Sequence, residues 1–260
     1  MAERRRCVVE EQWNGRAAVV TGGSSGIGLA TAAELANEGY ALVIAGRDEA
    51  RLRAAAERIG TGTPVHVVVA DVATVAGTER VAAQARERFG QVDLVFANAG
   101  RSDAPPVLQT LEHDFDLMMA TNVKSVFFTV VKLLPVLRQG GSVVVTSSVS
   151  EAKGRPGDPL YSASKAAVRS LVRTLALDEE VLARGVRVNA VTPGCIATPL
   201  TAQTDPEMQL AIDEYVTSTV PMARWGRPED VAHAVVFLAG ERASYLTGSE
   251  IVVDGGLAQI

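Results

Sequence analysis

A tyrosine and a lysine spaced for proton transfer stand in the second half of this 260-residue chain. Tyr161 begins the run Tyr-Ser-Ala-Ser-Lys, so Lys165 follows four positions later. On a helix this spacing places both side chains on one face. A phenol normally titrates near about 10, and a neighbouring ammonium lowers that pKa, which makes the phenol a general acid or base near neutral pH. The pair alone also fits a tyrosine on a helix surface that happens to lie beside a lysine.

A glycine-rich segment near the N-terminus provides a second, independent signal. Residues 21–28 read Thr-Gly-Gly-Ser-Ser-Gly-Ile-Gly and follow the apolar, β-branched run 17–20, which predicts a buried strand. The Ala- and Leu-rich stretch 27–38 predicts a helix that ends at Gly39. Strand, glycine turn and helix together are the context of a dinucleotide-binding fingerprint. Taken alone, the segment also fits a glycine-rich turn that binds no ligand.

Each glycine of this segment has a physical role in that interpretation. Gly22 permits the tight turn, Gly26 lets the backbone approach a pyrophosphate, and Gly28 allows the helix to pack closely on the strand. The helix N-terminus then offers free N–H groups and the positive end of its dipole to phosphates. The sequence therefore predicts a nucleotide site directly after the first strand.

The elements that must position these residues follow an alternating pattern. Apolar, β-branched runs alternate with amphipathic stretches, which is typical of βαβ units and a parallel sheet. The predicted strands are residues 17–21, 41–45, 65–70, 94–97, 142–147, 187–191 and 250–253. The predicted helices are 27–38, 49–59, 75–88, 111–137 (two helices around Asn122), 160–183 and 229–239, with an amphipathic helix around 207–216. In such a sheet the ligand lies beyond the carboxyl ends of the strands.

Composition limits the class of protein. With 47% hydrophobic and 21% charged residues, the chain predicts one α/β domain over residues 15–260, preceded by a short extension, residues 1–14. The basic run 4–6 has no apolar core behind it, as a secretory signal would need. No apolar run approaches the roughly 20 residues that span a bilayer. The net charge of −5 argues against a nucleic-acid partner.

The two cysteines predict neither a metal site nor a disulfide. Cys7 and Cys195 are far apart and lack metal-ligand spacing. This usage suits a reducing compartment, so we expect a cytoplasmic protein without a bound metal. Cys195 is interpreted as a small residue in the wall of the site.

Together these segments resemble the short-chain dehydrogenase/reductase family, in its short single-domain branch. The resemblance runs from about Asn14 to the C-terminus. Further segments stand in the family's order: Asp71-Val72, Asn98-Ala99-Gly100, Asn122, Pro193-Gly194, Thr198, 226–230 and 254–256. The resemblance implies a Rossmann-type, doubly wound sheet of seven parallel strands in the order 3-2-1-4-5-6-7, with helices on both faces. It also implies assembly into homotetramers, or homodimers.

The resemblance implies hydride transfer between a nicotinamide and a carbonyl or secondary alcohol. Tyr161 is expected to donate the proton in reduction and to remove it in oxidation, while Lys165 lowers the pKa of Tyr161 and binds the nicotinamide ribose. Ser148, thirteen positions before Tyr161, is expected to bind the substrate oxygen, with Ser147 as its rival. Asn122 is expected to disrupt its helix and to hold a water that relays protons to Lys165.

The expected cofactor-binding residues are carried over by position. They are Gly22, Ser24, Ser25, Gly26, Ile27, Gly28, Arg47, Asp71, Val72, Asn98, Ala99, Gly100, Tyr161, Lys165, Pro193, Gly194, Ile196 and Thr198. An NAD site usually has an acidic residue after the second strand, and Gly46 occupies that position here. Arg47 follows and offers a planar fork to a 2′-phosphate. This pattern favours NADP(H) over NAD(H). Alternatively, Arg47 only starts the next helix, with Asp48 as its N-cap or turned inward toward the ribose.

The expected substrate is a small carbonyl or alcohol, with a mild preference for a neutral or weakly polar ketone because no arginine cluster marks an anionic ligand. The segments 154–159 and 198–222 are expected to border it. Two other functions fit the same scaffold: an NAD-dependent alcohol or sugar dehydrogenase, and a regulator that senses NADP(H) without turnover. The complete set of Asn122, Ser148, Tyr161 and Lys165 favours an enzyme over the regulator.

Overall fold

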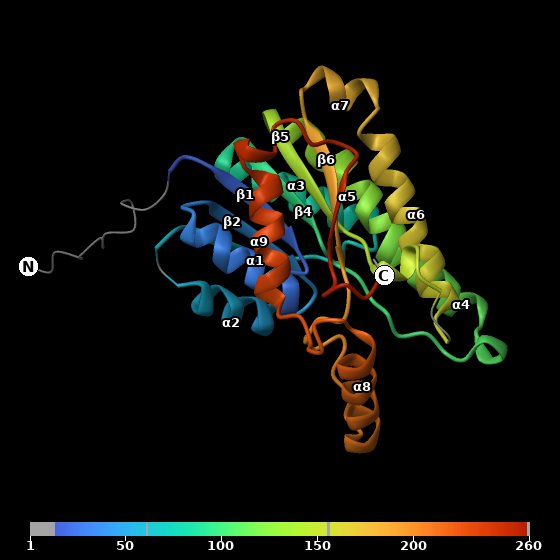
Figure 1. Cartoon of the computed structure of the whole chain (residues 1–260). Helices are drawn as coiled ribbons and strands as arrows, with labels where there is room; N and C mark the ends of the chain where they lie inside the picture. The colour runs from blue at the N-terminus through green and yellow to red at the C-terminus, as the bar shows by residue number, and fades with distance from the viewer. Residues whose placement is uncertain (1–13, 61, 155–156, 259–260) are drawn as a thin grey trace, which may run out of the picture.

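The predicted parallel sheet is present in the computed structural model, which describes residues 14–60, 62–154 and 157–258. The extension predicted for residues 1–14 lies outside these ranges, except for its last residue. Within the described residues, seven parallel strands pair in the order β3-β2-β1-β4-β5-β6-β7 (Figure 1), as predicted. They are β1 (Ala17–Thr21), β2 (Ala41–Gly46), β3 (Val65–Val69), β4 (Val92–Ala97), β5 (Leu137–Thr146), β6 (Arg187–Pro193) and β7 (Glu250–Val253).

Helices cover both faces of the sheet. The helices are α1 (Gly26–Asn37), α2 (Glu49–Ile59), α3 (Val75–Phe89), α4 (Glu112–Met119), α5 (Ser125–Leu133), α6 (Pro159–Leu175), α7 (Glu179–Ala183), α8 (Pro206–Thr219) and α9 (Pro228–Ala239). One face carries α1 and α9 side by side, and the other carries α3, α5 and α6. Buried residues form an apolar core on each face, as expected for a parallel sheet that is covered on both sides.

The central strands are buried from end to end. In β1, Ala18, Val19 and Val20 are completely inaccessible to solvent. Successive side chains of the strand point alternately into the two apolar cores. The strand order reverses between β1 and β4, which pair with each other in the middle of the sheet. Ligands of such sheets bind at this reversal, beyond the carboxyl ends of the strands.

Two predicted helices are wrong in extent. The predicted helix 160–183 is two helices, because Asp178 is extended and its side chain caps the backbone N–H groups of Glu180 and Val181. The helical range predicted for 111–137 ends earlier: α5 stops at Leu133, a 3₁₀ turn containing Pro135 follows, and β5 already begins at Leu137. Proline removes a backbone donor and cannot continue a helix interior.

The helical segment Glu112–Val136 is long and apolar enough to cross a membrane by length and composition, with a mean hydropathy of 1.4. The sequence argument from uninterrupted apolar runs did not detect it. Its side chains Val126, Val130 and Leu133 belong to the core between α5 and the sheet. Burial against the sheet therefore accounts for part of its apolar character, while Phe115, Phe127 and Val131 are exposed.

Candidate active site

The glycine loop after β1 leaves the N-terminus of α1 open. Gly22 has a φ of +68°, a conformation that a side chain disfavours. Ser25 stands at the N-cap without a side-chain cap, and the first turn of α1 contains no acidic residue. The backbone N–H groups at this helix start are therefore available to an anion.

Close packing explains the third glycine. A Cβ on Gly28 would lie 2.2 Å from the carbonyl oxygen of Gly22 and 2.7 Å from Nδ2 of Asn98. No rotamer of a larger residue relieves a contact with backbone. Gly28 thus lets α1 pack directly on the turn that it follows, as the sequence predicted.

Asn98 ties three strand ends together at this point. Its Nδ2 donates to the Thr21 carbonyl at 3.2 Å, and Thr146 Oγ1 donates to Asn98 Oδ1 at 3.0 Å. Its backbone N–H donates to Thr21 Oγ1 at 3.0 Å. The ends of β1, β4 and β5 are therefore held in a fixed arrangement below the site.

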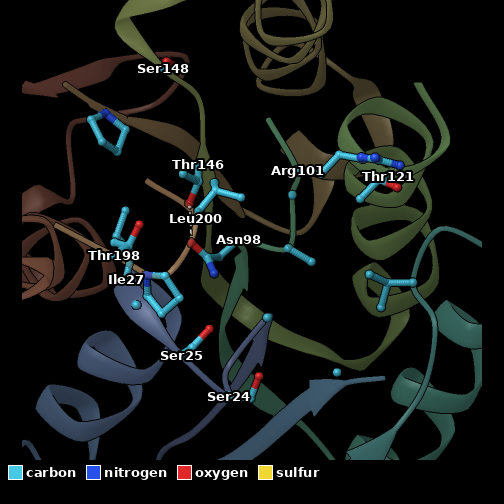
Figure 2. Close-up of a pocket in the computed structure, with 18 of the residues that line it drawn as sticks. Ser24, Ser25, Ile27, Asn98, Arg101, Thr121, Thr146, Ser148, Thr198 and Leu200 are labelled. Carbon is cyan, nitrogen blue, oxygen red and sulfur yellow. Dashed lines mark hydrogen bonds between the residues drawn. The ribbon is translucent and has the colours of Figure 1, made fainter. Parts of the chain in front are cut away.

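A cavity of about 420 Å³ lies over these strand ends. Figure 2 shows Ser24 and Ser25 at one side of it and Ser148 at the other. It is lined by every residue predicted to bind cofactor except Gly28, which lies beneath the loop, and by Ser148. Pro199, Leu200 and Thr201, from the segment 198–222 that was expected to border the substrate, also line it, and further lining residues that the sequence did not single out are Arg51, Ala70, Ala73, Arg101, Thr121 and Thr146. Segments far apart in the sequence thus meet at one site.

The Tyr161–Lys165 pair stands on the first turns of α6, as predicted. Proline at the start of α6 favours the helix there. Lys165 is only 4% exposed, and its Nζ lies 5.8 Å from the centre of the Tyr161 ring and donates to the Thr146 carbonyl at 2.9 Å. Burial lowers the pKa of Lys165 to about 8. The ammonium is therefore a largely desolvated charge beside the phenol.

Both serines after β5 line the cavity. Ser148 is 7% exposed, and its Oγ accepts the backbone N–H of Ser150 at 3.2 Å, which starts a 3₁₀ turn. Ser147 is 2% exposed, and its Oγ has no hydrogen-bond partner within the part of the chain that the structure describes. The choice of Ser148 over Ser147 stays a prediction.

Asn122 lies behind the cavity and does not line it. It stands in a π-helical turn, Ala120–Lys124, which interrupts the helix as predicted. Its Nδ2 donates to the Arg101 carbonyl and to Ser164 Oγ, both at 2.9 Å, and its Oδ1 accepts the Arg101 N–H at 2.8 Å. Asn122 therefore joins the loop after β4 to α6. The expected water relay to Lys165 stays a prediction.

Three arginines line the cavity, of which the sequence predicted one. Arg47 lies next to Gly46, as expected for a site without an acidic residue at that position. Asp48 caps α2, because its Oδ1 accepts the Arg51 N–H at 3.0 Å. Arg101 binds Asp103 through two hydrogen bonds, of 2.6 and 3.0 Å. These hydrogen bonds are the main cause that lowers the pKa of Asp103, and the charge of Arg47 makes a smaller contribution.

The comparison with known proteins decides the family. A family model described as enoyl-(acyl carrier protein) reductase matches residues 22–258. The chain belongs to the short-chain dehydrogenase/reductase family. It is 37% identical to a glucose 1-dehydrogenase of Gluconobacter oxydans over 255 residues, which covers 95% of this chain and 94% of that protein.

Solved structures of the same family share the fold. The crystal structure of a levodione reductase superposes with a TM-score of 0.88 at 34% identity, covering 95% of this chain and 99% of the other. The L-sorbose reductase of Gluconobacter frateurii, solved in complex with NADPH and L-sorbose, has a TM-score of 0.87 at 32% identity and covers 95% and 97%. The protein is thus an oxidoreductase of the short-chain type, acting on alcohol or ketone groups.

Proposed function

We propose that this protein reduces a neutral ketone, or oxidises the matching secondary alcohol, with NADP(H) as the cofactor. The observation that carries the cofactor choice is Arg47 at the cavity wall beside Gly46. A carboxylate at position 46 would repel a 2′-phosphate, and glycine leaves space for one. A guanidinium forms paired, charge-assisted hydrogen bonds with phosphate oxygens. The NADPH bound to the similar L-sorbose reductase supports the same choice.

The residues of the cavity fit a dinucleotide. The open N-terminus of α1 and the turn at Gly22 provide backbone donors for the pyrophosphate. Asp71 and Val72 border the space for the adenine. Thr198 lines the cavity close to Gly26, because a Cβ on Gly26 would lie 3.2 Å from the Thr198 side chain. When bound, the nicotinamide supplies or accepts the hydride.

The proton chemistry belongs to the side chains of this chain. Tyr161 donates its phenolic proton to the substrate oxygen in reduction and takes it back in oxidation. The buried ammonium of Lys165 favours the ionised phenol and so lowers its pKa. Ser148 holds the substrate oxygen near Tyr161. Asn122 fixes Arg101 and α6, which keeps the Tyr161 helix in place against the cofactor cavity.

The substrate end of the cavity favours a small, uncharged molecule. Pro199, Leu200 and Thr201 line the cavity together with Ser148, and these residues provide apolar surface and hydroxyl groups. Glucose, an aldose, and sorbose, a ketose, are named for the similar proteins, and both are uncharged polyhydroxy carbonyl compounds. We therefore place the substrate among neutral ketones and hydroxyketones.

Assembly and compartment complete the proposal. Phe115, Phe127 and Val131 on α4 and α5 are 51%, 38% and 39% exposed, an apolar surface that a second copy would cover, which supports a homotetramer or homodimer. The sequence has only two cysteines, without metal-ligand spacing or a disulfide framework, and this usage is compatible with a reducing cytoplasm. Light scattering of the purified protein measures the mass, and a monomer would contradict the assembly.

The direct test is oxidation of NADPH and NADH by the purified protein over a panel of ketones and hydroxyketones. We expect turnover with at least one class of ketone and a higher kcat/KM with NADPH. The Arg47→Ala variant should lose about tenfold to a hundredfold with NADPH and little with NADH. Equal losses with both would favour the NAD-dependent alternative, and tight NADPH binding without any turnover would favour the regulator.

A further inference from the structure

A second arginine stands at the same wall of the cavity as Arg47. Arg51 lies in the first turn of α2, and both residues line the cavity near Gly46. The wall beside them continues with Asp71 and Val72, where the adenosine half of the cofactor is proposed to lie. Arg51 is therefore placed at the part of the site where NADP(H) and NAD(H) differ.

The carboxylates at the start of α2 are already engaged by other groups. Asp48 Oδ1 accepts the backbone N–H of Arg51 at 3.0 Å. Glu49 binds Arg53 at 2.6 Å across one helical turn. Within the described residues, the side chains of Arg47 and Arg51 form no ion pair. Two guanidinium groups at the cavity thus keep their positive charge available.

Two other acidic side chains near the cavity, Asp71 and Asp103, are also bound by other groups. Asp71 Oδ1 accepts the N–H of Ala73 at 3.0 Å, and Asp103 is bound by both arms of Arg101. The charge of Arg47 reaches Asp103 and contributes to lowering its pKa, so an anion near Arg47 is favoured. Neither carboxylate forms an ion pair with Arg51 in the described part of the chain.

We propose that Arg51 is a second ligand for the 2′-phosphate of NADP(H), acting with Arg47 and setting the cofactor preference. The inference rests on the proposed use of NADP(H). A phosphate monoester carries a charge of about −1.5 to −2 at pH 7 and three acceptor oxygens. One guanidinium neutralises only part of that charge, and two planar forks engage more of its oxygens. The 2′-hydroxyl of NAD(H) offers no such charge.

The test separates phosphate recognition from turnover. Calorimetry measures the binding of adenosine 2′,5′-bisphosphate and of adenosine 5′-monophosphate to the wild type, Arg47→Ala, Arg51→Gln and Arg53→Gln. Glutamine keeps helix propensity and removes the charge. Arg53→Gln is the matched control, because Arg53 lies on the same helix but pairs with Glu49. The ratio of kcat/KM for NADPH and NADH is measured in parallel.

We expect Arg51→Gln to weaken the bisphosphate about tenfold, and to change binding of the monophosphate by less than about twofold. Arg53→Gln should leave both unchanged. If Arg47→Ala weakens the bisphosphate and Arg51→Gln does not, the role of Arg51 is refuted and the NADP(H) proposal stands. Equal losses for both ligands in Arg51→Gln also refute it. If the wild type does not prefer the bisphosphate, both proposals fail.

Discussion

Replacing Lys165 with methionine should stabilise the protein while it removes most turnover. Lys165 is 4% exposed, and burial lowers its pKa from 10.5 to about 8. At about 1.4 kcal/mol per pKa unit, the buried charge costs about 3 kcal/mol at pH 7. Methionine removes this cost but leaves the Thr146 carbonyl without its donor, a loss of about 1 kcal/mol. The expected net gain in unfolding free energy is about 2 kcal/mol.

The pH dependence of this gain has a definite sign. The pKa of Lys165 is lower in the folded chain, so the unfolded chain binds more protons between about pH 8 and 10.5. The unfolding free energy of the wild type therefore rises with pH across that window. The Lys165→Met variant lacks this rise. Its advantage is full below pH 8 and is lost as the pH approaches 10.5.

Urea unfolding followed by circular dichroism at pH 7 and pH 9.5, at one protein concentration, measures the difference. At pH 9.5 the two curves should agree to within about 0.5 kcal/mol. Lys132→Met is a suitable control, because Lys132 is a surface lysine paired with Glu79, and its loss should cost at most about 1 kcal/mol. A Lys165→Met variant that is less stable than wild type at pH 7 would refute the reasoning.

Three further outcomes are expected. Gly28→Ala should lower stability by about 1–3 kcal/mol and abolish the thermal shift on adding cofactor, because its Cβ would overlap the Gly22 carbonyl; retained binding would contradict the loop assignment. Asn122→Ala should cost about 2–4 kcal/mol in urea unfolding, because Arg101 loses its buried partners; a change below about 0.5 kcal/mol would contradict this role. The kcat/KM for reduction should fall about tenfold between pH 7 and pH 9 as Lys165 loses its proton; a flat profile would exclude a need for the charge.

The sequence predicted the sheet and the glycine loop because their signals are local. The run 17–20 is apolar on both faces, and the glycines after it permit few other arrangements. The strand order came from the family resemblance, since periodicity does not order strands. Tyr161 and Lys165 needed only helical spacing to fall on one face, and α6 begins two residues before the tyrosine.

The errors in the predicted helix bounds arose where contacts between distant residues determine the structure. Asp178 interrupts the predicted helix 160–183 because it caps the start of α7. Both stretches are acceptable as helix, so helix propensity does not show where one ends and the other begins. Leu137 joined β5 because its partner is Val92 on β4, a pairing far apart in sequence.

Arg101 and Arg51 were missed as lining residues for a similar reason. Arg101 follows the family segment Asn98-Ala99-Gly100 directly, but its position depends on hydrogen bonds to Asn122 from another helix. Arg51 lies in the first turn of the predicted helix 49–59, four residues after Arg47, and this short spacing was the available signal. Side-chain direction at a cavity wall is set by the packed structure and not by the local sequence.

The proton-transfer role of Tyr161 is the central claim, and the Tyr161→Phe variant tests it most directly. Phenylalanine keeps the ring and removes only the hydroxyl group. The turnover number with the best substrate from the ketone panel should fall by about 100-fold to 10 000-fold, while calorimetry should show cofactor binding close to that of the wild type. Turnover near the wild-type value, with cofactor bound normally, would contradict the assignment of Tyr161 as the general acid and base.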